Sequence, residues 1–427
     1  MRGKDRTICW LVLDGVADRP APALDGQTPL EAAATPNLDR LAAAGTNGTM
    51  DVSRPGTPLS SDRAHTLLFG YDHDEVPGRG VLEATGLDVP VPEGAVACSA
   101  SFARADATAE GWTVRDRHLD ADAADYERTA ERVADFETDA ATVSFTYTWK
   151  NRGIVVLEPT DPDRPLSPAV TDVDPFEVPA PVLDPRPLDA ASAPAAAART
   201  AEALAAYTRW TADRLDAEPV DVVLSKWAGA PGPPESFETR HGLRACSLTA
   251  KPVLAGLAET LGMAVRTPPD QYAARPDAIA DAVDDYEFVH VHYPEPDEVS
   301  HAAGPAAKRD EIAAIDETLA PVVDRALAAD DLVTVVTADH TTPSTEDVVH
   351  SGEPVPVTMV AEGVRTDDVS AVGERPAATG GLGRVRGRDC LRLSRAAADR
   401  VLLDGLRRSP ANRDYPNQSL TPLSRGP

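Results

Sequence analysis

The sequence predicts an α/β protein in which a mostly parallel sheet is flanked by helices and a smaller α+β domain is inserted into the chain. Two observations favour this fold class. Short apolar runs alternate with amphipathic stretches near both ends of the 427-residue chain, as in parallel sheets that helices cover on both faces. Between about residues 95 and 215 this alternation is lost, and Asp, Ala and Pro dominate. We therefore expect a discontinuous core (1–90 and 218–405), an inserted domain (91–217) and a flexible tail (406–427).

The N-terminal segment predicts one strand and two helices. The apolar run Ile8–Leu13 predicts a buried strand; it is too short for a signal sequence and ends at Asp14. Thr35-Pro36 predicts a helix start, because Thr caps helices and Pro fits their first position, and Gly45 predicts the end. A second helix is predicted where Ser60-Ser61-Asp62 precedes an apolar stretch.

The remaining elements follow from the same signals. In the insertion we expect two strands, a proline-rich connection and a long alanine-rich helix, at Thr142–Tyr147, Gly153–Leu157, 175–194 and 195–215. The alternation then resumes with strands at Val220–Leu224, Tyr286–His292, Leu332–Thr337 and Val355–Val360, and with helices at Lys251–Leu261 and Ala306–Ala328.

The charge balance excludes two classes of partner. A net charge of −28 argues against binding to nucleic acid or to an anionic membrane surface. Only five of the 41 basic residues are lysines. An acidic, lysine-poor surface suits concentrated salt, where screening removes carboxylate repulsion, and we hypothesise a salt-loving source. An ordinary acidic enzyme is the alternative.

The cysteines and the hydropathy indicate an intracellular, cytoplasmic protein. Four cysteines lie far apart without metal-ligand spacing, so reduced thiols are expected rather than disulfides or a metal site. We find no run of eighteen apolar residues that predicts a membrane span.

Acidic and imidazole side chains follow three of the predicted strands. Ligands of open α/β sheets bind beyond the carboxyl ends of the strands, so these side chains are expected to converge. Oxygen and imidazole ligands without thiolates suit Mn²⁺, Zn²⁺, Co²⁺ or Mg²⁺, and two such ions about 4 Å apart support phosphoryl displacement. The residues are Asp14, the pair Asp297 and His301, and the pair Asp339 and His340, with His350 further along the last loop.

Ser61 is the candidate nucleophile. It immediately precedes a predicted helix, where free amide groups and the helix dipole favour an anion. A metal ion bound to its oxygen would lower the pKa of the hydroxyl and activate it without a histidine base.

Each feature also has a purely structural interpretation. Asp14 suits a turn or helix cap, the Asp297 and His301 spacing also occurs on helix surfaces, and Ser60 or Ser61 suits a helix cap. His290 and His292 are expected to line a strand end and are not included among the metal ligands. Only the ordered combination favours a metal centre.

Several segments resemble one family. The N-terminal LVLDGVADRPAPALDGQTPLEAAATPNLDRLAAAG is similar to the opening of archaeal-type cofactor-independent phosphoglycerate mutases of the alkaline phosphatase superfamily. RPGTPLSSDRAHTLLFGYD and GRGVLEATG resemble the family's nucleophile segment. FVHVHYPEPDEVSH, KRDEIAAID and VTADHTTPSTEDVVHSGEPVPV resemble its other metal-binding segments.

The resemblance implies an alkaline-phosphatase-like core and two divalent ions, with Mn²⁺ preferred. One ion would be held by Asp14, Ser61, Asp339 and His340, and the other by Asp297, His301 and His350. Ser61 would accept the phosphoryl group and return it to the same substrate, and the inserted domain would close over it.

The resemblance also implies substrate-binding residues in or beside the insertion, namely Asp116, Arg117, Arg152 and Lys226. The sequence departs from the family here. ACSASF lacks the family arginine, the arginine after Asp116-Arg117-His118 is missing, and Lys226 stands where arginine is common. A lysine is a point charge and does not reproduce the bidentate arginine fork.

We therefore expect interconversion of 3-phosphoglycerate and 2-phosphoglycerate through a phosphoserine at Ser61, with a small phosphorylated acid as the partner. A phosphatase or another phosphotransferase with the same site is the alternative that the missing arginines favour. A non-catalytic binding relative is the third. The oligomeric state stays open.

Overall fold

The structure, a computed structural model, describes residues 6–117, 119, 121–215, 219–345, 348–405 and 422–425. The chain divides into two compact units. The first unit contains Met1–Glu75, Pro234–Lys251 and Leu261–Pro427, and the second contains Val76–Pro233 and Pro252–Thr260. Most of the expected tail, 406–421 and 426–427, lies outside the described residues.

The first unit is built on a sheet of eight described strands in the order β11-β10-β12-β1-β13-β14-β2-β15. Neighbouring strands are parallel except where β14 pairs with β13 and with β2, which confirms the predicted mostly parallel sheet. The strands are β1 (Thr7–Leu13), β2 (Thr46–Asp51), β10 (Ala245–Leu248), β11 (Ala264–Arg266), β12 (Phe288–Tyr293), β13 (Leu332–Thr337), β14 (Val355–Val360) and β15 (Gly383–Arg386).

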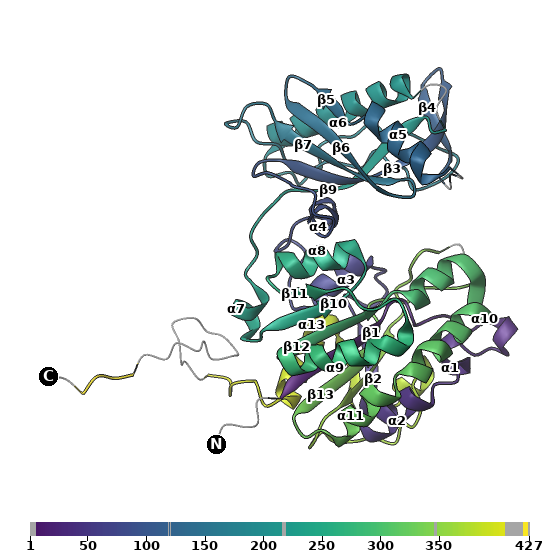
Figure 1. The fold of residues 1–427 in the computed structure, drawn as a ribbon, viewed down its shortest axis with the longest axis vertical. Helices are drawn as coiled ribbons and strands as arrows, with labels where there is room; N and C mark the ends of the chain where they lie inside the picture. Colours follow the sequence, from purple (N-terminus) through teal and green to yellow (C-terminus); the bar gives the residue numbers. More distant parts are fainter. Residues whose placement is uncertain are drawn as a thin grey trace. The chain divides into compact units, whose positions relative to one another are not determined.

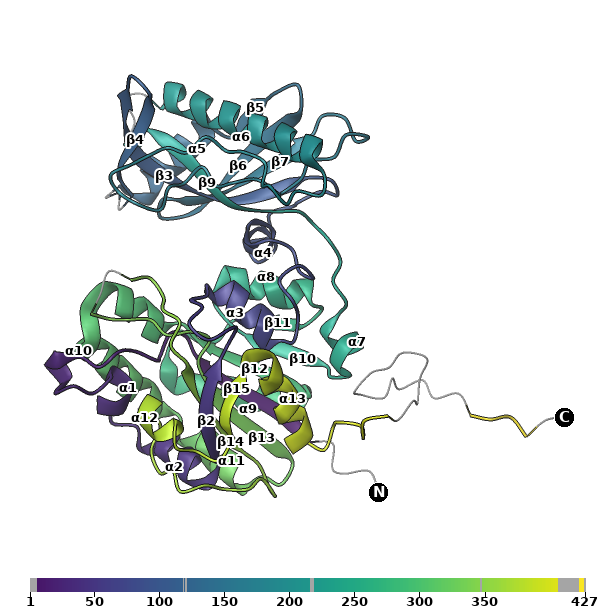
Figure 2. The same cartoon turned by 180° about the vertical axis from the view of Figure 1, so that it is seen from behind.

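Helices cover both faces of this sheet, as the sequence predicts. In Figures 1 and 2, α9 and α11 lie over one face, and α3 and α13 lie over the other. The helix expected over 306–328 is divided into α10 and α11, because Pro321 starts a new helix rather than continuing one. The helices are α1 (Pro29–Ala32), α2 (Pro36–Ala44), α3 (Ser61–Leu68), α7 (Phe237–His241), α9 (Arg275–Asp285), α10 (Glu295–Thr318), α11 (Ala320–Ala328), α12 (Glu374–Ala377) and α13 (Gly387–Ala397), with short 3-10 turns at Pro22–Leu24 and Tyr272–Ala274.

The second unit is an antiparallel sheet with helices packed on it. Its described strands run in the order β5-β6-β7-β3-β4-β8, and β9 pairs with β3. The strand expected at Val220–Leu224 is found as β9, but it pairs antiparallel with β3 instead of joining the parallel sheet. The elements are β3 (Val96–Thr108), β4 (Gly111–Asp116), β5 (Asp135–Glu137), β6 (Ala141–Trp149), β7 (Arg152–Pro159), β8 (Ala180–Pro181), β9 (Val222–Gly229), α4 (Arg79–Thr85), α5 (Ala123–Arg132), α6 (Pro194–Arg214) and α8 (Pro252–Thr260).

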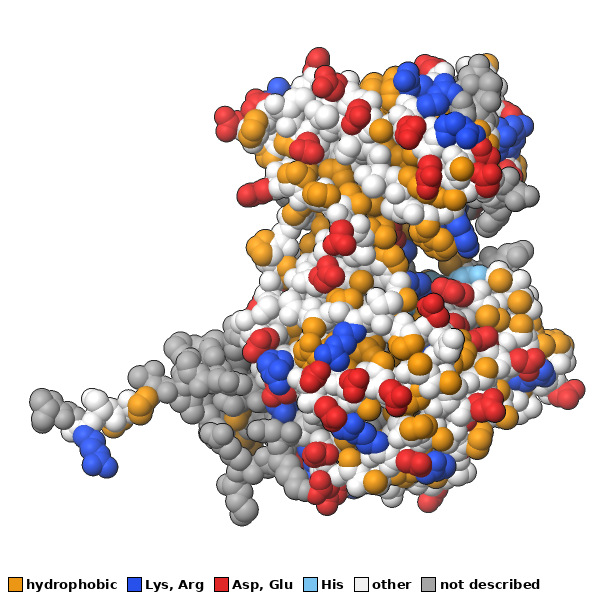
Figure 3. All heavy atoms as spheres, viewed as in Figure 1, with side chains coloured by type: hydrophobic (Ala, Val, Ile, Leu, Met, Phe, Trp, Pro, Cys, Tyr) orange, Lys and Arg blue, Asp and Glu red, His pale blue; other side chains and the backbone are white. Residues whose placement is uncertain are grey.

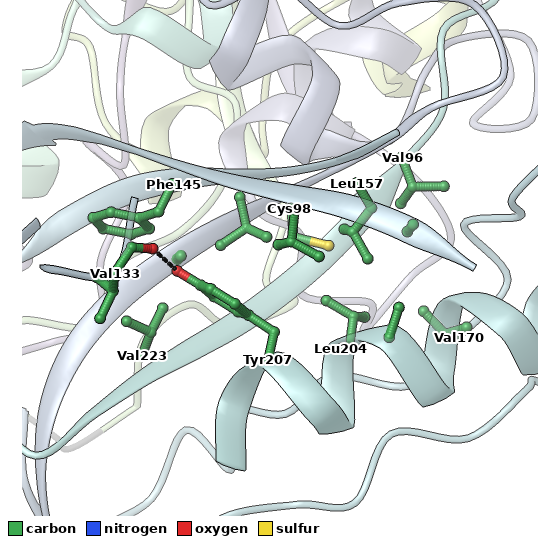
Figure 4. Packing of buried hydrophobic residues seen from close by; sticks show 14 of the residues in the cluster. Val96, Cys98, Val133, Phe145, Leu157, Val170, Leu204, Tyr207 and Val223 are labelled. Carbon is green, nitrogen blue, oxygen red and sulfur yellow. Dashed lines mark hydrogen bonds between the residues drawn. The ribbon is translucent and has the colours of Figure 1, made fainter. Parts of the chain in front are cut away.

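The core of the second unit lies between its sheet and α6. Figure 4 shows Leu204 and Tyr207 of α6 packed against strand residues such as Cys98 and Leu157. The Tyr207 hydroxyl donates a 2.9 Å hydrogen bond to the carbonyl oxygen of Val133. The alanine-rich helix therefore packs closely through small side chains, and the hydroxyl of its buried Tyr207 is satisfied internally.

The surface reflects the acidic composition. On the face shown in Figure 3, Asp and Glu side chains are spread over both units rather than gathered in one patch. All four cysteines are buried and free. Among the described residues, no helix has the length and apolar character that crossing a bilayer requires.

Candidate metal centre and cation cluster

The candidate metal ligands gather at one edge of the first unit's sheet. Strand β1 pairs in parallel with both β12 and β13, so the carboxyl ends of the three strands lie side by side. Asp14 follows β1 directly, Asp297 lies in the first turn of α10 after β12, and Asp339 follows β13. All three carboxylates are buried. The topology thus brings together residues that are more than three hundred positions apart in the sequence.

Ser61 is the first residue of α3, and its side chain faces this edge. The Ser61 hydroxyl oxygen lies 3.3 Å from Nε2 of His340. Ser60, at the N-cap position, makes no capping hydrogen bond through its side chain. Ser61 therefore contacts the candidate ligands directly, with its oxygen near the helix N-terminus, where partial positive charge favours an anion.

The first candidate metal group consists of Asp14, Asp339 and His340. One ligand atom from each lies within 4.8 Å of the others. Nε2 of His340 is 3.2 Å from Oδ1 of Asp14 and 3.3 Å from Oδ2 of Asp339. Those two carboxylate oxygens are buried without a hydrogen-bond partner. Since buried polar atoms are nearly always paired, this arrangement fits a bound cation.

The electrostatics of this group also fit a cation. Burial raises the pKa of the Asp339 carboxyl well above its usual range, and the charge of Asp14 adds to the effect. Burial acts in the same direction on Asp14, but Lys251, His292 and His340 outweigh it and hold the pKa of Asp14 below its usual range. A divalent ion between two buried carboxylates would remove their mutual repulsion.

The second candidate group consists of Asp297, His340 and His350, again with ligand atoms within 4.8 Å of one another. Nε2 of His350 lies 3.4 Å from Oδ1 of Asp297, and the His340 and His350 rings stack with centroids 3.7 Å apart. His301 also approaches Asp297, at 3.3 Å, from one turn further along α10. The structure thus brings all seven predicted residues into one region, with His340 common to both groups. The donor set, oxygen and imidazole without thiolate, fits divalent ions.

Three residues beside the groups, of which His65 and His292 are fully buried and Lys251 is partly exposed, were not predicted from the sequence. Nζ of Lys251 lies 2.7 Å from Oδ2 of Asp14 and 3.7 Å from Oδ2 of Asp297. His292, which we expected only to line a strand, donates from Nε2 to Oδ2 of Asp14 at 3.0 Å. His65, one turn after Ser61, contacts the Ser61 carbonyl oxygen at 2.8 Å. No local sequence pattern distinguishes Lys251 from the other four lysines.

The candidate substrate residues lie in the second unit. Arg117 and Lys226 both contact Oδ2 of the fully buried Asp174, at 2.7 and 2.8 Å. Burial lowers the pKa of Lys226, and the charges of Arg117 and Arg152 lower it further against the opposing effect of Asp174. Arg117 and Lys226 therefore share the Asp174 carboxylate and Arg152 acts on Lys226 through its charge; we call these three side chains the cation cluster. Asp116 is exposed at the end of β4.

Aromatic rings flank these cations. The Lys226 ammonium lies 5.3 Å from the ring centroid of Phe176 and 4.9 Å from that of Trp227. Phe176 and Trp227 both have left-handed backbones, with φ of 61° and 56°. Left-handed backbones at residues other than glycine cost free energy and cluster at functional sites, and the ring faces of Phe176 and Trp227 stabilise the neighbouring ammonium. Sequence reasoning missed Asp174 and both aromatic residues.

The comparison with known families defines the class. The model of the metalloenzyme superfamily matches residues 6–396, and the chain belongs to that superfamily. A 2,3-bisphosphoglycerate-independent phosphoglycerate mutase of Methanopyrus kandleri is 34% identical, over 93% of this chain and 98% of that relative. A 2,3-bisphosphoglycerate-independent phosphoglycerate mutase of Methanosphaera stadtmanae is also 34% identical, over 90% of this chain and 96% of that relative. Within the superfamily, the chain belongs to the archaeal 2,3-bisphosphoglycerate-independent phosphoglycerate mutase family.

Two solved structures agree with this assignment. A Pyrococcus horikoshii protein superposes with a TM-score of 0.75 at 27% identity, over 94% of this chain and 99% of that one. A cofactor-independent phosphoglycerate mutase from Thermoplasma acidophilum gives a TM-score of 0.61 at 27% identity, over 92% and 100%. The family expected from the sequence segments is confirmed.

Proposed function

We propose that this protein interconverts 3-phosphoglycerate and 2-phosphoglycerate through a phosphoserine at Ser61. The observation that carries the proposal is the Ser61 hydroxyl, 3.3 Å from His340, beside two groups of candidate metal ligands in a chain of the mutase family. The substrate class comes from the curated relatives, which are named as mutases.

The chain's own residues account for the steps. The Ser61 oxygen attacks the phosphorus, the bond between phosphorus and the substrate oxygen breaks, and the phosphoryl group rests on Ser61 while the Ser61 proton passes to the released substrate oxygen. The hydroxyl on the neighbouring substrate carbon then attacks that phosphorus, the bond between phosphorus and the Ser61 oxygen breaks, and the proton of that hydroxyl returns to Ser61. The Lys251 ammonium, 2.7 Å from Asp14, balances negative charge at the site throughout.

Two divalent ions would be held by Asp14, Ser61, Asp339 and His340 on one side and by Asp297, His301 and His350 on the other. They would lower the pKa of the Ser61 hydroxyl and neutralise charge on the moving phosphoryl group. We propose Mn²⁺ as the native ion, with Zn²⁺, Co²⁺ and Mg²⁺ as alternatives, because oxygen and imidazole donors accept all four.

We propose that Arg117, Arg152 and Lys226 hold the phosphate and carboxylate of the substrate, and that Asp116, at the end of β4, accepts a hydrogen bond from a substrate hydroxyl. The shared contact with Asp174 supports the choice of Arg117 and Lys226, and the electrostatic effect of Arg152 on Lys226 supports the choice of Arg152. Charge-assisted hydrogen bonds of this kind give both affinity and orientation.

The test uses purified protein with Mn²⁺ and 3-phosphoglycerate, without added bisphosphoglycerate. We expect 2-phosphoglycerate to form, and we expect Ser61→Ala to lower kcat by about 10³-fold or more while Mn²⁺ still binds. Ser60→Ala is the matched control and is expected to retain activity, because its side chain makes no capping bond. Absence of product from wild-type protein with Mn²⁺ bound would contradict the proposal.

A phosphatase acting on another phosphorylated acid is the second candidate. Lys226 favours it, because a lysine at this position grips a phosphate or carboxylate less firmly than an arginine fork does. Release of inorganic phosphate from a panel of phosphomonoesters, without formation of the isomer, would select this activity.

We also propose that the protein works in a salt-rich cytoplasm. The net charge of −28 and the spread of acidic side chains over the surface support this. In concentrated salt, carboxylate repulsion is screened within a few ångströms. Thermal unfolding is expected at a higher temperature in about 2 M KCl than in dilute buffer; an equal midpoint in both would contradict the proposal.

A further inference from the structure

A buried hydroxyl connects the two candidate metal groups. Thr342 follows the Asp339-His340 pair by two residues and is fully buried. Its hydroxyl donates a hydrogen bond to Oδ1 of Asp297 at 2.8 Å. The hydroxyl oxygen of Thr342 also lies 3.1 Å from Nδ1 of His340. Thr342 therefore contacts a ligand of the second group and the histidine that both groups share.

The direction of these bonds sets the chemistry of His340. A hydroxyl carries one proton, and Thr342 gives it to the Asp297 carboxylate, which can only accept. The bond to His340 must then run from Nδ1–H of the imidazole to the Thr342 oxygen. In this tautomer, the lone pair of His340 is on Nε2, the atom that faces Asp14, Asp339 and Ser61.

Two hydrogen bonds hold the backbone of Thr342 in place. Its amide donates to the Ala17 carbonyl oxygen at 3.0 Å. Its carbonyl accepts at 2.9 Å from Nζ of Lys308, a fully buried lysine that also contacts Ala17 and Asp18. The loop after β13 is thereby joined to the loop after β1 and to α10.

The neighbouring Gly15 leaves the space that this hydroxyl needs. A Cβ atom built on Gly15 would lie 2.3 Å from the Thr342 hydroxyl oxygen, and φ at Gly15 is +59°. A side chain at residue 15 would therefore displace Thr342. Residue 15 is therefore a glycine because the Thr342 side chain, from the loop after β13, occupies the space that a side chain would need.

We infer that Thr342 is a positioning residue that fixes the His340 tautomer and orients Asp297, so that both metal groups depend on one hydroxyl. This inference rests on the proposed metal centre. Thr342 is not expected to contact the substrate. Loss of a hydrogen-bond partner of a metal ligand typically weakens metal affinity by about 10- to 100-fold.

The test compares variants by Mn²⁺ titration calorimetry and by the rise in melting temperature on adding Mn²⁺. Thr342→Val keeps the shape and removes the hydroxyl, and its Mn²⁺ affinity is expected to fall by roughly 10- to 100-fold. Thr342→Ser keeps the hydroxyl and is expected to stay within about threefold of wild type. The matched control is Thr334→Val, because the Thr334 hydroxyl of β13 is buried without a partner; its affinity is expected to be unchanged.

The outcomes separate the two proposals. Wild-type affinity in Thr342→Val, or an equal loss in Thr342→Ser, overturns the positioning role while the proposed function stands. Failure of wild-type protein to bind Mn²⁺ overturns the metal centre and this inference with it. Should the valine variant not fold, Thr342→Ala and Thr342→Ser differ by the hydroxyl alone and carry the same comparison.

Discussion

The two units use charged residues in different ways. In the first unit, carboxylates and imidazoles meet at the carboxyl edge of a parallel sheet, where the strand order alone brings them together. In the second unit, cations surround a single buried aspartate beside an antiparallel sheet, and the core beneath is apolar. The arrangement in the first unit suits the binding of metal cations, and the arrangement in the second unit suits the binding of anions.

The lysines make the comparison sharper. Of the four lysines that the structure describes, only Lys150 is exposed, and it is held over the Trp149 ring. The other three are paired with buried aspartates: Lys226 with Asp174, Lys251 with Asp14 and Lys308 with Asp18. In a chain that relies on arginine elsewhere, lysine is retained mainly where a compact point charge fits an enclosed position.

The largest expected effect is on stability, at Lys308. Its Nζ makes three contacts with no exposure to solvent, so Lys308→Met leaves the buried Asp18 carboxylate without its counter-charge, although the amides of Arg19 and Ser344 still donate to it. We expect the free energy of unfolding of the first unit to fall by about 3–5 kcal/mol, measured by urea unfolding. Adding Asp18→Asn is expected to restore part of the loss. Lys150→Met is the exposed control, and a loss as large as that of Lys308→Met would contradict this explanation.

The next effect separates chemistry from binding. Lys251→Met removes a charge that contacts the candidate metal ligands Asp14 and Asp297, and we expect kcat to fall by about 10²- to 10³-fold. Lys226→Met removes one charge-assisted hydrogen bond from the cation cluster, and we expect KM for 3-phosphoglycerate to rise roughly 10- to 100-fold with kcat little changed. Steady-state kinetics with saturating Mn²⁺ measures both. If kcat and KM changed in the same way in both variants, catalysis and substrate binding would not be divided between the two units.

The contrast also explains what the sequence could predict. Asp14, Asp297 and Asp339 each follow a strand with a clear apolar run, and parallel neighbours place such residues at one edge, so local signals were sufficient. The roles of Lys251, His292 and Thr342 depend on residues that are distant in the sequence, and no local sequence pattern predicts such contacts. His292, for example, is defined by its bond to Asp14, 278 residues away.

In the second unit, the missing information is mainly tertiary. β3 is the longest described strand, yet its sequence VACSASFARADAT is rich in Ala and gave no strand signal. It is a strand because β4, β7 and β9 all pair with it. Asp174 lies in a proline-rich stretch outside regular structure, so its burial between Arg117 and Lys226 could not be read from periodicity.

The smallest effect compares one hydrogen bond in each unit. Tyr207 of the second unit donates to the Val133 carbonyl at 2.9 Å, and Tyr71 of the first donates to the Glu235 carbonyl at 2.8 Å. Both rings are buried, so Tyr207→Phe and Tyr71→Phe each remove a hydroxyl and leave a carbonyl without that partner. We expect each to lower the free energy of unfolding by about 1 kcal/mol. If calorimetry resolves two transitions, each substitution is expected to shift a different one. An equal shift of both transitions by either variant would mean that the units unfold together.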